Sequence, residues 1–183
     1  MTTALVLGGA DCLHRDIEAY SGPVDLVIAC NDAGTVWPGR LDAWVSLHPV
    51  NFWDKQWLAT REANGYPAAD RMFAHLQADR ASKHGKIPPG VEFTEYRFPG
   101  QAKSGSSGLF AAKVALINFG AAHVVFCGVP MVPVPHFFGG DAWDVATRMR
   151  EEWRTVPAEY LARMRSMSGW TQEMLGAPDG NTG

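Results

Sequence analysis

The chain has 183 residues, of which 46% are hydrophobic and 19% charged, and its formal net charge is -3 at pH 7. This length fits one domain with one core, and the composition is that of a globular protein. No apolar run approaches the roughly 18 residues of a membrane span, and no run of lysine or arginine marks a surface for nucleic acid. We therefore expect neither a membrane partner nor a nucleic-acid partner.

The amino terminus and the cysteines bear on the compartment. Met1–Leu7 has no basic segment before its apolar residues, so it predicts a buried strand rather than a signal peptide, and we expect a cytoplasmic protein. Cys12, Cys30 and Cys127 are odd in number, far apart and without CxxC spacing. This pattern argues against a disulfide framework or a zinc site and predicts three small buried thiols.

Short apolar segments alternate with helical ones along the chain. We expect helices at 12–20, 109–119, 142–155 and 171–175, and strands at 4–7, 24–30, 43–47, 91–98, 123–127 and near 161–167. Between them, 51–82 is predicted to form a helical cover that is broken at Gly65-Tyr66-Pro67. Strands that are apolar on both faces are typical of a parallel sheet between two layers of helices. The sequence predicts a doubly wound α/β domain over 1–177 and a flexible tail at 178–183.

Four polar or glycine-rich clusters follow predicted strands or begin a predicted helix. They are Gly8-Gly9-Ala10-Asp11, Asn31-Asp32, His48 and Ser104–Gly108. Because the carboxyl ends of parallel strands meet at one edge, these clusters are predicted to line one crevice. Glycines admit a phosphate close to the backbone, and helix starts offer it free N–H groups. Neither GxGxxG nor a P-loop is present, which argues against a dinucleotide, and either serine of Ser106-Ser107 is equally well explained as a helix cap.

A second kind of signal lies in the proline- and glycine-rich segment beyond the last long strand. His136 in this segment is a candidate general acid or base beside the crevice, and a histidine bonded within its own loop is the alternative. The six histidines show neither HxH nor HExxH spacing, so we expect no metal site built by the protein. Tryptophans near 53–67 are candidates to stack on a base or sugar, or to form a homo-oligomer interface.

Four segments in this order and spacing resemble the Rossmann-like family of bacterial sialyltransferases and related phage and bacterial proteins of unknown function. They are Ala4–Gly9, Ala29–Asp32, Ser104–Ala111 and Val125–Met131. The resemblance implies a Rossmann-like fold and a site for the cytidine nucleotide of a CMP-sugar, with no cofactor. It assigns the general base to His136 and the nucleotide contacts to Gly8, Gly9, Asn31, Ser106, Ser107, Gly108 and Gly128.

The chain also departs from that family. Gly8-Gly9-Ala10-Asp11 stands where the enzymes tend to have Gly-Asn-Gly-Pro-Ser, and the loop around His136 lacks the tyrosines that help the leaving phosphate. We therefore expect a protein that binds a nucleotide or a nucleotide-sugar, with glycosyl transfer by direct displacement as the first choice. The alternatives are a non-catalytic phage or bacterial accessory protein that binds a ligand, and a diphosphotransferase acting on a pterin alcohol. The latter would need Mg²⁺, for which Asp11 and Asp32 are the candidate carboxylates.

Overall fold

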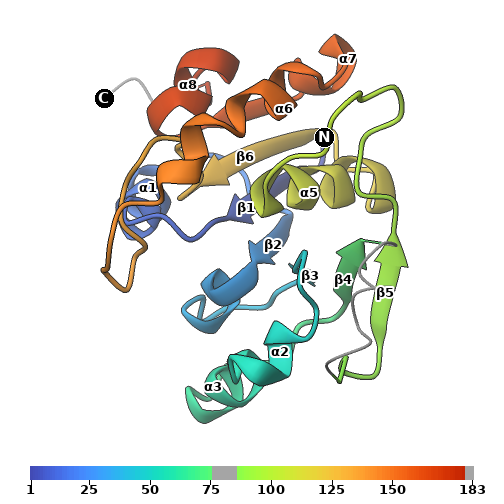
Figure 1. The fold of residues 1–183 in the computed structure, drawn as a ribbon, viewed down its shortest axis with the longest axis vertical. Helices are drawn as coiled ribbons and strands as arrows, with labels where there is room; N and C mark the ends of the chain where they lie inside the picture. Colours follow the sequence, from blue (N-terminus) through green and yellow to red (C-terminus); the bar gives the residue numbers. More distant parts are fainter. Residues whose placement is uncertain (76–85, 180–183) are drawn as a thin grey trace.

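A parallel sheet forms the centre of the molecule. The computed structural model describes residues 1–75 and 86–179, and its seven strands run in the order β5-β4-β3-β2-β1-β6-β7 (Figure 1). All the pairings are parallel. The strands are Thr3–Leu7 (β1), Leu26–Cys30 (β2), Ala43–Val45 (β3), Met72–His75 (β4), Val91–Thr94 (β5), His123–Cys127 (β6) and Met164–Ser166 (β7).

Helices cover both faces of this sheet. In β1, Ala4 and Val6 belong to the apolar cluster that contains α5, whereas Leu5 and Leu7 belong to the cluster that contains α1. This two-sided burial is what a continuously apolar strand predicts, and it confirms the doubly wound, Rossmann-like α/β class. The helical elements are Leu13–Ala19 (α1), Asn31–Thr35 (η1), Asn51–Asp54 (α2), Trp57–Ala63 (α3), Ser107–Lys113 (α5), Val114–Asn118 (η3), Asp144–Thr147 (η4), Arg150–Arg154 (α6), Ala158–Leu161 (α7) and Gly169–Leu175 (α8).

The order of the strands defines a switch point. From β1 the chain adds β2, β3, β4 and β5 on one side, and then returns to place β6 and β7 on the other side of β1. Connections that leave β1 and β6 in opposite directions open a crevice above the carboxyl ends of these two strands.

Among the described residues, no helix is long and apolar enough to cross a membrane.

The structure corrects the expected helical cover at 51–82. Helices α2 and α3 do occupy its first half, but Met72–His75 forms strand β4 between β3 and β5. Phe73 and Ala74 are buried there, so pairing within the sheet overrides the helical pattern of the local sequence. Residues 76–82 of the expected cover and 180–183 of the expected tail lie outside the described residues. The helix expected at 142–155 is divided into η4 and α6.

Candidate functional site

A cleft of about 780 Å³ lies above the carboxyl ends of β1, β2, β3 and β6. Residues of all four clusters line it, although Asp11 and the first two residues of Ser104–Gly108 do not, so the crevice predicted from the clusters exists as one space. Asp11 is exposed, is not part of the lining, and uses its backbone N–H to bond the carbonyl of Pro135 at 3.0 Å. The candidates that line the cleft are Gly8, Gly9, Asn31, Asp32, His48, Ser106, Ser107, Gly108, Gly128 and His136.

The glycines allow the loops of the cleft floor to approach one another. A Cβ on Gly8 would stand 2.4 Å from the carbonyl oxygen of Gly128, and one on Gly108 would stand 2.7 Å from Cγ1 of Val129. Gly128 itself has a φ of +72°, in the left-handed region that favours glycine. The loops after β1 and β6 and the start of α5 therefore meet only because these positions lack side chains.

Asn31 connects the ends of three elements. Its backbone φ is 49°, an uncommon left-handed conformation that asparagine tolerates better than most residues. Its side chain donates to Ser107 Oγ at 3.2 Å and accepts from Ser46 Oγ at 3.0 Å, while its carbonyl accepts from Trp44 Nε1. Asn31 thus fixes the turn after β2 against β3 and α5, and strained positions of this kind cluster at functional sites.

The two serines at the start of α5 differ in their surroundings. Ser106 is buried and is the N-cap of the helix, because its Oγ accepts from the backbone N–H of Leu109 at 3.4 Å. The same Oγ accepts from Trp153 Nε1 at 3.3 Å. Ser107 is half-buried and receives the Asn31 amide. The helix-cap alternative therefore describes Ser106. Both serines line the cleft, and Ser107 is the less buried of the two.

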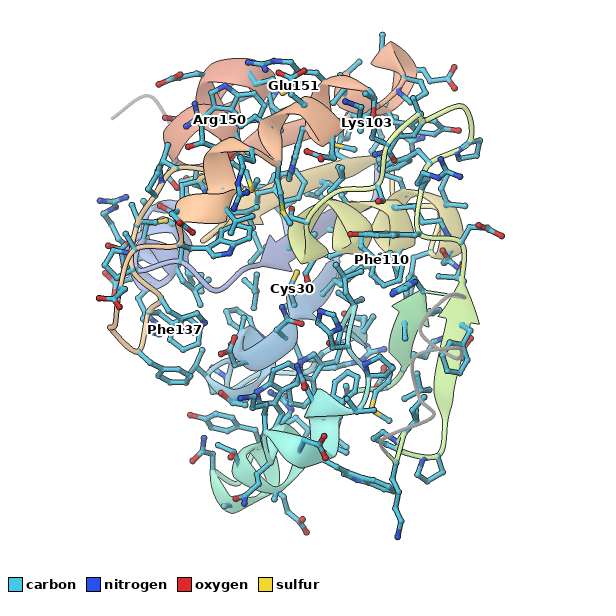
Figure 2. All side chains as sticks on the ribbon, in the orientation of Figure 1. Cys30, Lys103, Phe110, Phe137, Arg150 and Glu151 are labelled. Atoms are coloured by element: carbon cyan, nitrogen blue, oxygen red, sulfur yellow. The ribbon has the colours of Figure 1, made fainter. Side chains whose placement is uncertain are left out.

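His136 lies on the loop beyond β6 and contacts both the first loop and the turn after β2. Its Nε2 is 2.9 Å from Oδ1 of Asp32, and its Nδ1 accepts from the backbone N–H of Phe138 at 3.2 Å. A Cβ on Gly9 would stand 2.7 Å from Nε2, so the ring sits directly on that glycine. Figure 2 shows the neighbouring Phe137 on this loop at the edge of the molecule, and Cys30 at the centre, where β2 ends.

The aromatic lining agrees only in part with the sequence expectation. Trp57 lines the cleft, but it is only 8% exposed and stacks on Trp44 with ring centroids 6.4 Å apart, and Trp53 is not part of the lining. The exposed aromatic ring of the cleft belongs to Trp143, which is 45% exposed on the loop after Gly140. Sequence reasoning missed this residue, although the proline- and glycine-rich character of its loop marks it as a candidate binding segment.

Buried thiols underlie the cleft, as the sequence predicts. All three cysteines are free and buried. Burial raises the pKa of Cys30 and Cys127, and it raises the pKa of Cys12 to about 11. Cys30 lines the cleft and donates to the carbonyl of Ser107 at 3.5 Å. Neutral thiols of this kind pack as small apolar groups and are poor nucleophiles.

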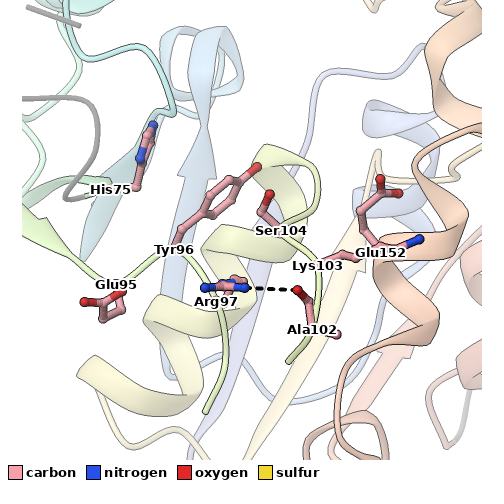
Figure 3. Close-up of a pocket in the computed structure, with 8 residues that line it drawn as sticks. All are labelled: His75, Glu95, Tyr96, Arg97, Ala102, Lys103, Ser104 and Glu152. Atoms are coloured by element: carbon pink, nitrogen blue, oxygen red, sulfur yellow. Dashed lines mark hydrogen bonds between the residues drawn. The ribbon is translucent and has the colours of Figure 1, made fainter. Parts of the chain in front are cut away.

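A smaller pocket of about 460 Å³ lies beyond the carboxyl ends of β4 and β5 (Figure 3). Its lining includes Ser104, from the same cluster that supplies Ser106 and Ser107 to the main cleft. Tyr96 stands between His75 and Gly105: its ring stacks on His75 at 5.1 Å, and its hydroxyl donates to the Gly105 carbonyl. Burial raises the pKa of Tyr96 to about 12 and lowers the pKa of His75.

Within residues 1–75 and 86–179, no group of three or more His, Cys, Asp or Glu side chains could hold a metal ion.

Solved structures with a similar fold include sialyltransferases. The structure is similar to the sialyltransferase CstII from Campylobacter jejuni in complex with the substrate analogue CMP-3FNeuAc, with a TM-score of 0.63 and 11% identity over 100% of this chain and 89% of that chain. It is also similar to the sialyltransferase CST-II in complex with a trisaccharide acceptor and CMP, with a TM-score of 0.64 and 11% identity over 100% of this chain and 88% of that chain. No protein-family model matches the sequence, and no curated protein matches it. At this identity the likeness establishes the fold.

Proposed function

We propose that the main cleft binds a nucleotide or nucleotide-sugar and that the protein transfers the sugar by direct displacement. The observation that carries this proposal is the position of the cleft at the switch point between β1 and β6, where it gathers residues from the ends of four strands. Ligands of open α/β sheets bind at this position. The cleft volume of about 780 Å³ suits a small molecule, since such sites commonly measure roughly 300–1,000 Å³.

The neighbours support a cytidine nucleotide as the ligand to test first. Their structures contain CMP, a CMP-sugar analogue, or CMP with a trisaccharide acceptor, and they share the fold over the whole of this chain. The order of the four sequence segments supports the same class of ligand. Asn31, Ser107 and Gly128 then lie where the nucleotide would contact the cleft floor.

The Asp32–His136 pair favours a catalytic role over a silent binding role. A carboxylate and an imidazole in hydrogen-bond contact at 2.9 Å, with side chains 27% and 33% exposed, can accept a proton from an acceptor hydroxyl. The reaction forms a bond from that hydroxyl oxygen to the glycosyl carbon, and it breaks the bond from that carbon to the phosphate oxygen. The diphosphotransferase alternative has less support, because Asp11 does not join Asp32 in the cleft lining.

Thermal unfolding with and without ligands tests the proposal. We expect CMP or a CMP-sugar, at about 100 times its dissociation constant, to stabilise the protein by about 2.7 kcal/mol, which is roughly 5–10 °C, with EDTA present. UDP, GDP and ATP, each with and without Mg²⁺, give the comparison. A labelled CMP-sugar with oligosaccharide acceptors then measures transfer. The absence of a shift with every nucleotide would overturn the proposal.

Two tryptophans of similar exposure test where the ligand binds. Trp143 lines the cleft and is 45% exposed, whereas Trp53 is 42% exposed and lies outside it. Because base or sugar stacking on an aromatic ring contributes about 1–3 kcal/mol, we expect Trp143→Ala to weaken nucleotide binding at least fivefold. Trp53→Ala should leave the dissociation constant unchanged. Equal dissociation constants for the two variants would place the ligand elsewhere.

A further inference from the structure

Both ring nitrogens of His136 are engaged within the protein. The backbone N–H of Phe138 can only donate, so Nδ1, which lies 3.2 Å from it, carries the lone pair. A neutral imidazole has one N–H, which is therefore on Nε2 and donates to Oδ1 of Asp32 at 2.9 Å. In this tautomer His136 has no free lone pair to receive a proton from a substrate.

The loop holds the His136 ring in this orientation. The backbone N–H of Phe137 donates to the carbonyl of Gly9 at 3.0 Å, and that of Asp11 donates to the carbonyl of Pro135 at 3.0 Å. The ring also contacts the rings of Phe137 and Phe138, with centroids 4.2 Å and 5.2 Å away. Turning the ring to free Nδ1 would break its bonds to both Phe138 and Asp32.

Asp32 is placed by the rigid side of the cleft. It follows Asn31 in η1. The Asn31 carbonyl accepts from Trp44 Nε1 of β3, and the Asp32 carbonyl accepts from Thr35 Oγ1 at 2.7 Å, so the turn is bonded both to the sheet and within itself. Its Oδ1 accepts the hydrogen bond from the Nε2–H of His136. Among the residues that the structure describes, no donor bonds its Oδ2. Its side chain is 27% exposed and Asp32 lines the cleft, so Oδ2 is the carboxylate oxygen that is available to a substrate bound there.

We propose that Asp32 accepts the proton of the acceptor hydroxyl and that His136 is its positioning residue, an inference that rests on the proposed glycosyl transfer. The O–H bond of the acceptor breaks, and its proton passes to Oδ2 of Asp32. The hydroxyl oxygen bonds to the glycosyl carbon, and the bond from that carbon to the phosphate oxygen breaks. Its electron pair leaves with the nucleotide. Asp32, now a neutral carboxylic acid, returns the proton to water.

Three variants separate Asp32 from His136 as the proton acceptor. Asp32→Asn still accepts from His136 but cannot take a proton, so transfer should fall by about 10²–10⁴-fold while CMP still raises the melting temperature. His136→Gln keeps an N–H for Asp32 and His136→Ala does not, so His136→Gln should be at least tenfold more active than His136→Ala. If His136→Gln is as inactive as His136→Ala, or if Asp32→Asn keeps more than a tenth of the transfer rate, the assignment is wrong.

The tautomer of His136 gives a readout that is independent of activity. In long-range ¹H–¹⁵N spectra of histidine-labelled protein, with the signals of His136 assigned by their loss in His136→Ala, we expect the proton on Nε2. A proton on Nδ1 would overturn the inference even if transfer is observed. A wild-type protein that shows the Nε2–H tautomer but neither nucleotide-dependent stabilisation nor transfer would instead overturn the proposed function, and the role of Asp32 with it.

Discussion

Gly9 in the loop after β1 lies directly against the His136 ring of the Asp32–His136 pair. A Cβ at this position would stand 2.7 Å from Nε2 and 3.0 Å from Cδ2 of His136. Both contacts are to the imidazole ring, which is held by hydrogen bonds to Asp32 and to the backbone of Phe138. An added methyl group would therefore push the ring away from Asp32. We expect Gly9→Ala to lower the free energy of unfolding by about 1–3 kcal/mol and to reduce transfer at least tenfold. Urea denaturation and the transfer assay measure the two effects.

Gly65→Ala is a control in which a glycine is replaced without a side-chain clash. Gly65 has a φ of +72° but has nothing within 4 Å of the added Cβ, so the change tests backbone strain without a clash. It should cost about 1 kcal/mol and leave transfer unchanged. A Gly9→Ala protein with wild-type stability and transfer would show that the His136 ring does not rest on Gly9.

Sequence reasoning finds the residues of the site more readily than their pairings. Glycines and polar residues after apolar strands identify Gly8, Gly9, Asn31 and Asp32 because a parallel sheet collects strand ends at one edge. The pairing of Asp32 with His136 spans 104 positions and depends on how the loop after β6 folds back over the first loop. No local pattern encodes that return, and none indicates that Ser106, rather than Ser107, is the N-cap of α5.

At the scale of elements, Arg61 holds the segment that begins at η1. This side chain on α3 is 2% exposed, and burial lowers the pKa of its guanidinium. Its donors satisfy four backbone carbonyls at 2.6–2.8 Å, those of Gly34, Trp37, Gly39 and Pro67. Because Arg61→Met leaves these carbonyls without donors, we expect it to lower the free energy of unfolding by about 3–5 kcal/mol. Urea denaturation measures the loss.

Arg40→Met provides the comparison at the surface. The Arg40 side chain is 70% exposed. It pairs with the exposed Asp70 and with the buried Asp42, which also accepts from the backbone N–H of Val27 at 2.8 Å. Exposed ion pairs contribute little, so this variant should remain within about 1 kcal/mol of the wild type. If Arg61→Met proved as stable as Arg40→Met, the carbonyl network would not support the turn that carries Asp32.

Elements are predictable from the sequence where local pattern and tertiary environment agree. Strands β1, β2 and β6 are apolar apart from Thr3 and His123 at the first positions of β1 and β6, and nearly all of their residues are buried, so composition locates them. At β4 the two disagree: Met72 and Phe73 fit an amphipathic helix locally, but pairing with Trp44 and Val45 of β3 places them in the sheet. That pairing is a non-local interaction, and a window of neighbouring residues does not contain it.

At the scale of the whole molecule, the alternation of strands and helices predicts the class of fold but not the order of the strands. The step from β5 back to β6, beside β1, creates the switch point and with it the cleft. Residues from both sides of the switch line the cleft floor. A substitution in either half of the chain can therefore alter the same site.

The carboxyl edge of the sheet also gives the molecule a pH dependence. Cys30 ends β2 and Cys127 ends β6, and burial raises the pKa of both thiols. In the unfolded chain these thiols ionise above about pH 8.5, while in the folded protein they stay neutral. The unfolded state then binds fewer protons, so stability is fully present below that pH and falls as the pH rises, by about 1.4 kcal/mol per unit and thiol. Lys113 acts in the opposite direction, since burial lowers its pKa.

Denaturation of wild-type and Cys30→Ala/Cys127→Ala proteins between pH 7 and 11 tests this dependence. We expect the wild type to lose stability steadily above about pH 9, with Cys12, whose pKa burial raises to about 11, contributing in both proteins. Removing the two thiols should make the fall of the unfolding free energy with pH less steep, by about 3 kcal/mol per pH unit above pH 9. The smaller alanine side chains lower the free energy of unfolding by the same amount at every pH, because a packing defect does not titrate. Parallel curves for the two proteins would mean that Cys30 and Cys127 ionise alike in the folded and unfolded states.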